Sequence, residues 1–187
     1  MNTLKLPVDY KEVLFVDLTN DKKKWALLNG VYILFLIFGL FMGHWLFPDI
    51  ITTKTIISQN YFLFMIASYV YIIIHELIHG LFIKLTSGFK VDYGFSLSYA
   101  FAGNKLAYFN KKSYLLIAMS PVILIGSVIT LLLMTLPDSY FVFFFMLQIL
   151  NIGGGLGDFY LTYLTLKMPD DMLVNDSGTI MTFYSKV

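Results

Sequence analysis

The sequence predicts an all-α membrane protein, and three observations favour this fold class. The chain is 58% hydrophobic and only 13% charged, whereas a soluble domain averages about 25% charged residues. Its mean hydropathy is +0.74. Its apolar residues gather in four long runs separated by short polar segments. We therefore expect four transmembrane helices in a single integral membrane domain that covers residues 1–187.

Each apolar run is long enough to cross a bilayer, whose hydrocarbon core is about 30 Å thick and needs about 20 helical residues. Trp25 and Trp45 fall near the ends of the first run, as in the aromatic belts of membrane interfaces. The second run holds Glu76 and the fourth holds Asp158, and ionisable groups inside a bilayer are typical of functional sites. The predicted spans are residues 25–47, 61–85, 114–136 and 140–166.

The placement of lysines predicts the orientation of these helices. All 13 cationic side chains are lysines, and an N-terminus inside the cell leaves only Lys54 outside. The charged arm 1–24 is unlike a signal peptide. We expect a multi-pass protein of the cell membrane with both termini cytoplasmic. The lipid bilayer is one expected partner. The near-neutral charge and the absence of arginine argue against a nucleic-acid partner. Homo-oligomerisation stays open.

The loop between the second and third spans predicts a cytoplasmic β-hairpin. Residues 91–102 alternate apolar with polar or small side chains, which is typical of a strand with one apolar face. Gly103-Asn104 predicts a turn, and residues 105–109 could return as a second strand. Such a hairpin could bind an extended substrate as an added strand, or it could only anchor the loop. In the third span, Ser120-Pro121 predicts a kink.

Residues 75–79 read HELIH, an HExxH motif within the second span. His75 and His79 are one helical turn apart on one face, which suits two ligands of one metal ion. Glu76 is offset by about 100° and could accept a proton from a water that the metal activates. The alternative is a pair of core histidines hydrogen-bonded to neighbouring helices.

A catalytic zinc commonly has three protein ligands, and the chain has no cysteine to supply one. His75 lies nine residues before Lys84, and Asp158 lies nine residues before Lys167, at the cytoplasmic ends of their spans. Both residues are therefore expected about 14 Å from the boundary, at 1.5 Å per residue. His44 belongs to the opposite end of the bundle. Depth thus predicts Asp158 as the third zinc ligand.

A glycine-rich segment, residues 153–157, directly precedes Asp158. Small residues allow helices to approach closely, and several glycines weaken a helix, so local unwinding is expected near Asp158. Asn151 lies seven residues before Asp158 and shares its face if the helix continues. Its amide could bind a substrate, or it could join two helices by a hydrogen bond.

These residues resemble those of the site-2 protease family of intramembrane zinc metallopeptidases. The resemblance implies that His75, His79 and Asp158 hold zinc and that Glu76 is the general base. Ser120-Pro121 is similar to a Gly-Pro pair of that family, and Asn151 occupies roughly the place of its asparagine. The family's proline-rich segment ending in Leu-Asp-Gly is absent, because this chain reads Leu-Gly-Asp-Phe at residues 156–159.

The chain is also similar to a family of small bacterial membrane proteins described as zincin peptidases, which have four spans, HELIHG-like text and a Gly-Asp in the last span. This likeness extends to the tail segment LVNDSGTIMTFYS, residues 173–185. The expected function is thus an intramembrane zinc metallopeptidase acting on membrane-embedded or membrane-proximal peptides. The alternatives are a non-catalytic metal-binding membrane subunit and a silent relative that binds membrane helices through its glycine face.

Overall fold

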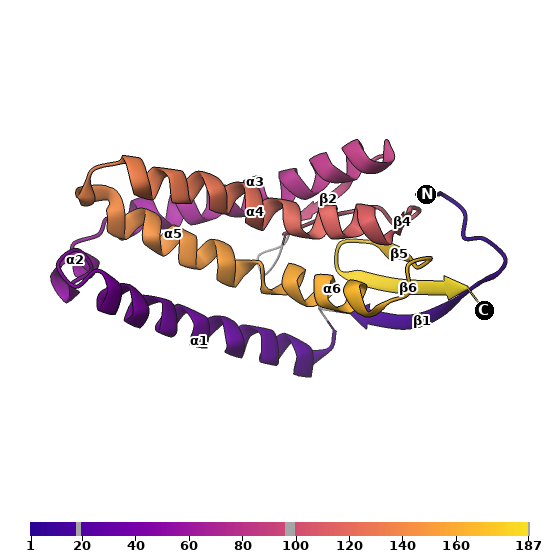
Figure 1. Cartoon of the computed structure of the whole chain (residues 1–187), viewed down its shortest axis with the longest axis horizontal. Helices are drawn as coiled ribbons and strands as arrows, with labels where there is room; N and C mark the ends of the chain where they lie inside the picture. Colours follow the sequence, from indigo (N-terminus) through magenta and orange to yellow (C-terminus); the bar gives the residue numbers. More distant parts are fainter. Residues whose placement is uncertain (18–19, 96–99, 187) are drawn as a thin grey trace.

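The computed structural model is an elongated helical bundle with a small β-sheet at one end, beside which both chain termini lie (Figure 1). It describes residues 1–17, 20–95 and 100–186. In chain order the elements are β1 (Tyr10–Asp17), α1 (Lys22–Leu46), α2 (Thr53–Ile57), α3 (Tyr61–Ser87), β2 (Asp92–Phe95), β3 (Ala100–Gly103), β4 (Tyr108–Asn110), α4 (Lys111–Thr135), η1 (Asp138–Tyr140), α5 (Phe141–Gly154), α6 (Leu156–Lys167), β5 (Leu173–Asp176) and β6 (Ile180–Lys186).

Four helical segments carry the apolar runs, and each predicted span matches one of them to within three residues at either end. By length and composition, all four are long and apolar enough to cross a membrane. Many of their large apolar side chains are exposed, as lipid-facing residues would be; Leu34 of α1 is 69% exposed and Phe62 of α3 is also 69% exposed. The four segments are Lys22–Leu46, Tyr61–Ser87, Lys111–Thr135 and Asp138–Lys167.

Polar residues define where these helices begin and end. The side chains of Asp21, Asn60 and Asn110 each accept a hydrogen bond from a backbone N–H group in the first turn of α1, α3 and α4. Such caps satisfy N–H groups that a helix start leaves unpaired. At the other end of α3, Gly88 adopts the left-handed conformation (φ 72°) that commonly terminates a helix. The HExxH motif therefore lies on a helix with well-defined ends.

The last helical segment is interrupted at Gly155. Helix α5 ends at Gly154 and α6 begins at Leu156, and a Cβ atom at Gly155 would clash with the side chain of Val122 on α4. Glycine at residue 155 thus permits close contact with α4 at the point where the last helical segment is interrupted. The unwinding predicted near Asp158 occurs three residues earlier, and it places Asp158 in the first turn of α6.

The predicted all-α fold class is wrong, because the two ends of the chain form a β-sheet together with β4, which directly precedes α4. Its four strands run antiparallel to their neighbours in the order β1-β6-β5-β4. Strand β1 comes from the N-terminal arm, whereas β5 and β6 form the C-terminal tail. The protein therefore combines four long helical segments with an antiparallel sheet that joins its termini.

A hairpin follows α3 as predicted, but its two strands are not the predicted ones. Strand β2 pairs antiparallel with β3, and Phe95 lies opposite Ala100. The single strand expected over 91–102 is therefore two strands, and its middle, residues 96–99, lies outside the described residues. Part of the expected return strand, 105–109, instead contributes to β4, which pairs with β5 in the other sheet.

The main core lies where the sheet meets α3, α4 and α6. Phe109, Val174 and Phe183 are fully buried there and pack with Ile83 of α3 and Leu161 of α6. Helix α1 packs mainly along α5. Because β1 and β6 pair, the two terminal strands lie at the same end of the bundle. The assignment of that end to the cytoplasm stays a prediction.

Candidate metal centre

The two histidines of the HExxH motif lie side by side on α3. Their imidazole ring centroids are 4.9 Å apart, and His75 and His79 are only 8% and 9% exposed. Glu76 is half-buried on the adjoining face of the helix. The local geometry therefore matches the spacing argument: two imidazoles share one direction, and a carboxylate lies beside them.

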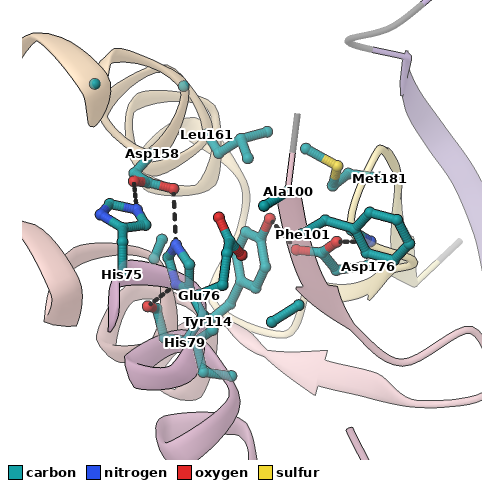
Figure 2. A pocket seen from close by; sticks show the side chains of 16 residues that line it. His75, Glu76, His79, Ala100, Phe101, Tyr114, Asp158, Leu161, Asp176 and Met181 are labelled. Carbon is teal, nitrogen blue, oxygen red and sulfur yellow. Dashed lines mark hydrogen bonds and ion pairs between the residues drawn. The ribbon is translucent and has the colours of Figure 1, made fainter. Parts of the chain in front are cut away.

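Asp158 lies directly opposite the two imidazoles (Figure 2). Its Oδ2 atom is 3.1 Å from Nε2 of His75, and its Oδ1 atom is 3.3 Å from Nε2 of His79. One ligand atom from each of the three residues lies within 4.8 Å of the other two. The depth argument thus correctly predicted that Asp158 and His75 meet, although they are 83 residues apart in the chain.

His79 lies between two hydrogen-bond acceptors. Its Nδ1 atom is 2.8 Å from the backbone oxygen of Ile117, and its Nε2 atom faces the Asp158 carboxylate. A neutral imidazole has only one N–H donor, so both contacts are satisfied either by a protonated ring or by a cation between Nε2 and the carboxylate. The Ile117 contact requires the proton at Nδ1, which leaves the Nε2 lone pair of a neutral ring directed at Asp158.

His75 has an equivalent outer partner. The hydroxyl of Tyr71 is 3.2 Å from Nδ1 of His75 and donates a hydrogen bond to the backbone oxygen of Asn151 at 3.4 Å. With its proton used in this way, the hydroxyl oxygen can accept the Nδ1 proton of His75. Both imidazoles therefore present Nε2 toward Asp158, and outer partners of this kind orient metal-binding histidines.

The three side chains fit a zinc ion. Zinc accepts imidazole nitrogen and carboxylate oxygen at about 2.0–2.2 Å, commonly in a tetrahedral arrangement. Tetrahedral ligands at about 2.05 Å are about 3.3 Å from one another. Nε2 of His75 lies 3.1 Å from Oδ2 of Asp158 and Nε2 of His79 lies 3.3 Å from Oδ1, and one ligand atom from each of the three residues lies within 4.8 Å of the other two. His75, His79 and Asp158 would supply three ligands and leave a fourth position open, as in catalytic sites.

A pocket of about 150 Å³ opens beside these ligands. Glu76 and the three ligands line it from α3 and α6, whereas Phe101 of β3 lines it from the hairpin and Asp176 from the end of β5 (Figure 2). A carboxylate therefore borders the same space as the ligands, as the role of proton acceptor requires.

Sequence reasoning missed Asp176 and Tyr114 as members of this pocket. Oδ2 of Asp176 accepts a hydrogen bond from the Tyr114 hydroxyl at 2.9 Å, and Oδ1 accepts one from the backbone N–H of Gly178 at 2.7 Å. Burial raises the pKa of the Asp176 carboxyl above its ordinary value of 3.8. The family likeness included the tail segment 173–185, which contains Asp176, but the position of this tail beside the helices depends on the sheet, which was not predicted from the sequence.

Comparison with known families supports a metallopeptidase. Residues 68–173 of the 187, more than half of the chain, match the model of the family described as "Putative zincin peptidase". The chain belongs to this family. No curated protein and no solved structure matches it. The family and the His-His-Asp geometry together support a peptidase or metal-binding role for this zincin-family chain.

Asn151 is placed apart from the pocket of this zincin-family protein. It is fully buried, its Nδ2 atom donates to the backbone oxygen of Val122 at 3.0 Å, and its Oδ1 atom has no hydrogen-bond partner among the described residues. The contact joins α5 to α4, which is one of the two roles considered for it. Substrate binding by Asn151 stays a prediction. His44 is hydrogen-bonded to Ile51 in the loop after α1.

A second hollow, of about 410 Å³, reaches the same residues from another side. It shares His75 and Glu76 with the first pocket, and Leu28 and Tyr32 of α1 form part of its wall. The HExxH face thus borders two spaces, one toward the hairpin and the tail and the other toward α1.

Proposed function

We propose that this protein is an intramembrane zinc metallopeptidase that hydrolyses peptide bonds of membrane-embedded or membrane-proximal substrates. The observation that carries the proposal is the convergence of His75, His79 and Asp158, with both Nε2 atoms directed at one carboxylate. The family match supports the same chemistry. The apolar helices around the site support a substrate that arrives within the bilayer.

In this mechanism His75, His79 and Asp158 hold the zinc ion. Zinc, when bound, lowers the pKa of a water molecule and polarises the carbonyl that is attacked. Glu76 accepts a proton from the attacking water and later delivers it to the nitrogen of the leaving amine, as the C–N bond breaks. The Ile117 carbonyl and the Tyr71 hydroxyl keep the Nε2 atoms of the two imidazoles available by binding their Nδ1 protons.

The two hollows beside Glu76 support separate routes for substrate and water. The hollow lined by Leu28 and Tyr32 lies against α1, a helix with largely exposed apolar side chains, and suits a peptide from the bilayer. The pocket lined by Asp176 lies at the sheet end, where polar groups suit water. Strand β3 also lines this pocket, so binding of the peptide as an added strand stays a hypothesis beside simple anchoring of the loop.

The test compares the wild-type protein with Glu76→Gln, which keeps the size of the side chain but cannot accept the proton. Each purified full-length protein is reconstituted in nanodiscs and incubated with membrane vesicles from the source cells, and new peptide N-termini are identified by mass spectrometry. We expect cleavage in or beside membrane-spanning segments by the wild type, and its loss with Glu76→Gln or a zinc chelator. Equal cleavage by folded Glu76→Gln protein would contradict the mechanism.

A further inference from the structure

Helix α4 contains a backbone oxygen that lacks its ordinary helical partner. In a regular helix the carbonyl of Ile117 would accept a hydrogen bond from the N–H group of residue 121. Residue 121 is proline, which lies inside α4, is buried and has no N–H group. Inside a bilayer an unpaired backbone carbonyl is costly, because no water replaces the missing donor.

Two other donors bind this carbonyl. The Nδ1 atom of His79 lies 2.8 Å from the Ile117 oxygen, and the Ser120 hydroxyl donates to the same oxygen at 3.0 Å. A carbonyl oxygen has two lone pairs, so these two contacts fill its capacity. His79 thus takes up a backbone group that the proline sets free, on a helix other than its own.

We propose that Pro121 is a positioning residue for the metal centre: it frees the Ile117 carbonyl, which then holds His79 with Nε2 toward Asp158. This inference rests on the proposed zinc site. The proline predicted to kink this helix therefore has a specific role. Because it lacks an N–H group, the Ile117 carbonyl of α4 is available to His79 of α3.

The two histidines differ in how they are held. His75 uses a side chain, the Tyr71 hydroxyl, which a substitution on its own helix can remove. His79 uses a main-chain oxygen, which no substitution at Ile117 removes. The contact is instead sensitive to residue 121, because Pro121→Ala restores an N–H group that competes with His79 for the same lone pairs.

The positioning role and a purely structural role predict opposite results for Pro121→Ala. The restored hydrogen bond and the better helix former should leave the metal-free protein as stable as the wild type, or more stable. Loss of the outer partner of His79 should weaken zinc binding by about 10- to 100-fold. A merely structural proline would give changes of stability and affinity in the same direction.

The experiment measures zinc affinity by chelator competition and the thermal stability of the metal-free protein, both on the full chain in detergent micelles. Ser120→Ala is the matched control, since it removes the other donor to Ile117 and retains the proline; its affinity should stay within about threefold of the wild type. Pro121→Ala that binds zinc as tightly as the wild type overturns the inference. An equal loss in Ser120→Ala and Pro121→Ala also overturns it.

A second variant covers the case in which Pro121→Ala fails to insert. Pro121→Gly restores the same N–H group and makes the backbone at that position more flexible than alanine does, so it should weaken zinc binding to a similar extent. Its unchanged affinity would refute the role of the proline. The proposed function fails separately: a wild-type protein that binds no zinc, or binds it equally well after His75→Ala, contradicts the metal site itself.

Discussion

Gly103 lies where the hairpin meets the tail, and Gly103→Ala should weaken the contact that brings Asp176 to the pocket. A Cβ atom at Gly103 would be 2.5 Å from the nitrogen of Gly178, 2.7 Å from the carbonyl carbon of Ser177 and 2.9 Å from the oxygen of Asp176. Non-bonded contacts of carbon are normally about 3.5–4.0 Å. Strand β3 must therefore move away from the β5–β6 turn by about 0.5–1 Å.

This displacement is costly because the opposing atoms belong to the backbone and cannot rotate away as a flexible side chain can. Overpacking of this kind costs about 1–3 kcal/mol. The hydrogen bond from the Asn104 N–H to the Asp176 oxygen, 2.7 Å long, would also lengthen, and a typical hydrogen bond contributes about 0.5–1.5 kcal/mol. We expect the free energy of unfolding to fall by about 2–4 kcal/mol.

The assay is reversible unfolding by sodium dodecyl sulfate in mixed micelles, followed by circular dichroism. Gly30→Ala is the matched control, because a Cβ atom at Gly30 of α1 meets no described atom within 4 Å. Alanine in a helix interior is favoured over glycine by about 1 kcal/mol, so this control should be neutral or stabilising. If Gly103→Ala unfolds at the same detergent fraction as the wild type, the described docking of hairpin on tail is wrong.

Three further predictions concern the pocket and its supports. The pKa of the Asp176 carboxyl is raised, so this group keeps its proton to a higher pH in the folded protein than in the unfolded chain. The free energy of unfolding should therefore fall as pH rises above 3.8. Asp176→Asn should flatten this dependence, and a pH profile of detergent unfolding identical to that of the wild type would contradict the prediction. Tyr71→Phe should weaken zinc binding about 10-fold in chelator competition, since it removes the outer partner of His75; unchanged affinity refutes that role. Asn151→Ala should lower the free energy of unfolding by about 0.5–2 kcal/mol, because it removes the hydrogen bond to the Val122 carbonyl. The KM for a cleaved peptide should stay unchanged; a raised KM at unchanged stability would instead favour substrate binding by Asn151.

The helices could be predicted from the sequence because a membrane span is a local property. About 20 apolar residues in a row suffice, and lysine counting adds an expected direction. The sheet is not local. Strand β1 pairs Tyr10 with Lys186, nearly the full length of the chain away, and no strand was predicted in its charged arm. Pairing at such a separation leaves only short alternating segments as a signal.

In the hairpin, an alternating pattern that predicted one strand belongs to two antiparallel strands. The alternation over 91–102 runs through both strands, but Phe95 pairs with Ala100 and Tyr93 pairs with Ala102, so the large side chains of β2 lie opposite small residues of β3. No glycine or proline between the two strands marks a turn. The predicted turn residues, Gly103 and Asn104, instead contact the C-terminal tail, which explains why both are buried.

The convergence of the three candidate ligands was predictable, and most of the contacts that support them were not. His75 and His79 follow from a motif, and Asp158 follows from equal depth in two helices. Tyr71 lies four residues before His75 on the same face, a spacing that could have indicated its contact. The Ile117 carbonyl also had a signal, the proline four residues later, but its pairing with His79 depends on how α3 packs against α4.

The central claim is that the three convergent side chains bind zinc, and metal content measures it most directly. The full-length protein, purified gently in detergent, is analysed by inductively coupled plasma mass spectrometry beside folded His75→Ala and Asp158→Ala variants. The account predicts about one zinc ion per wild-type chain and less than about one tenth in each variant. Less than about half an ion per wild-type chain, or equal zinc in the variants, would contradict it.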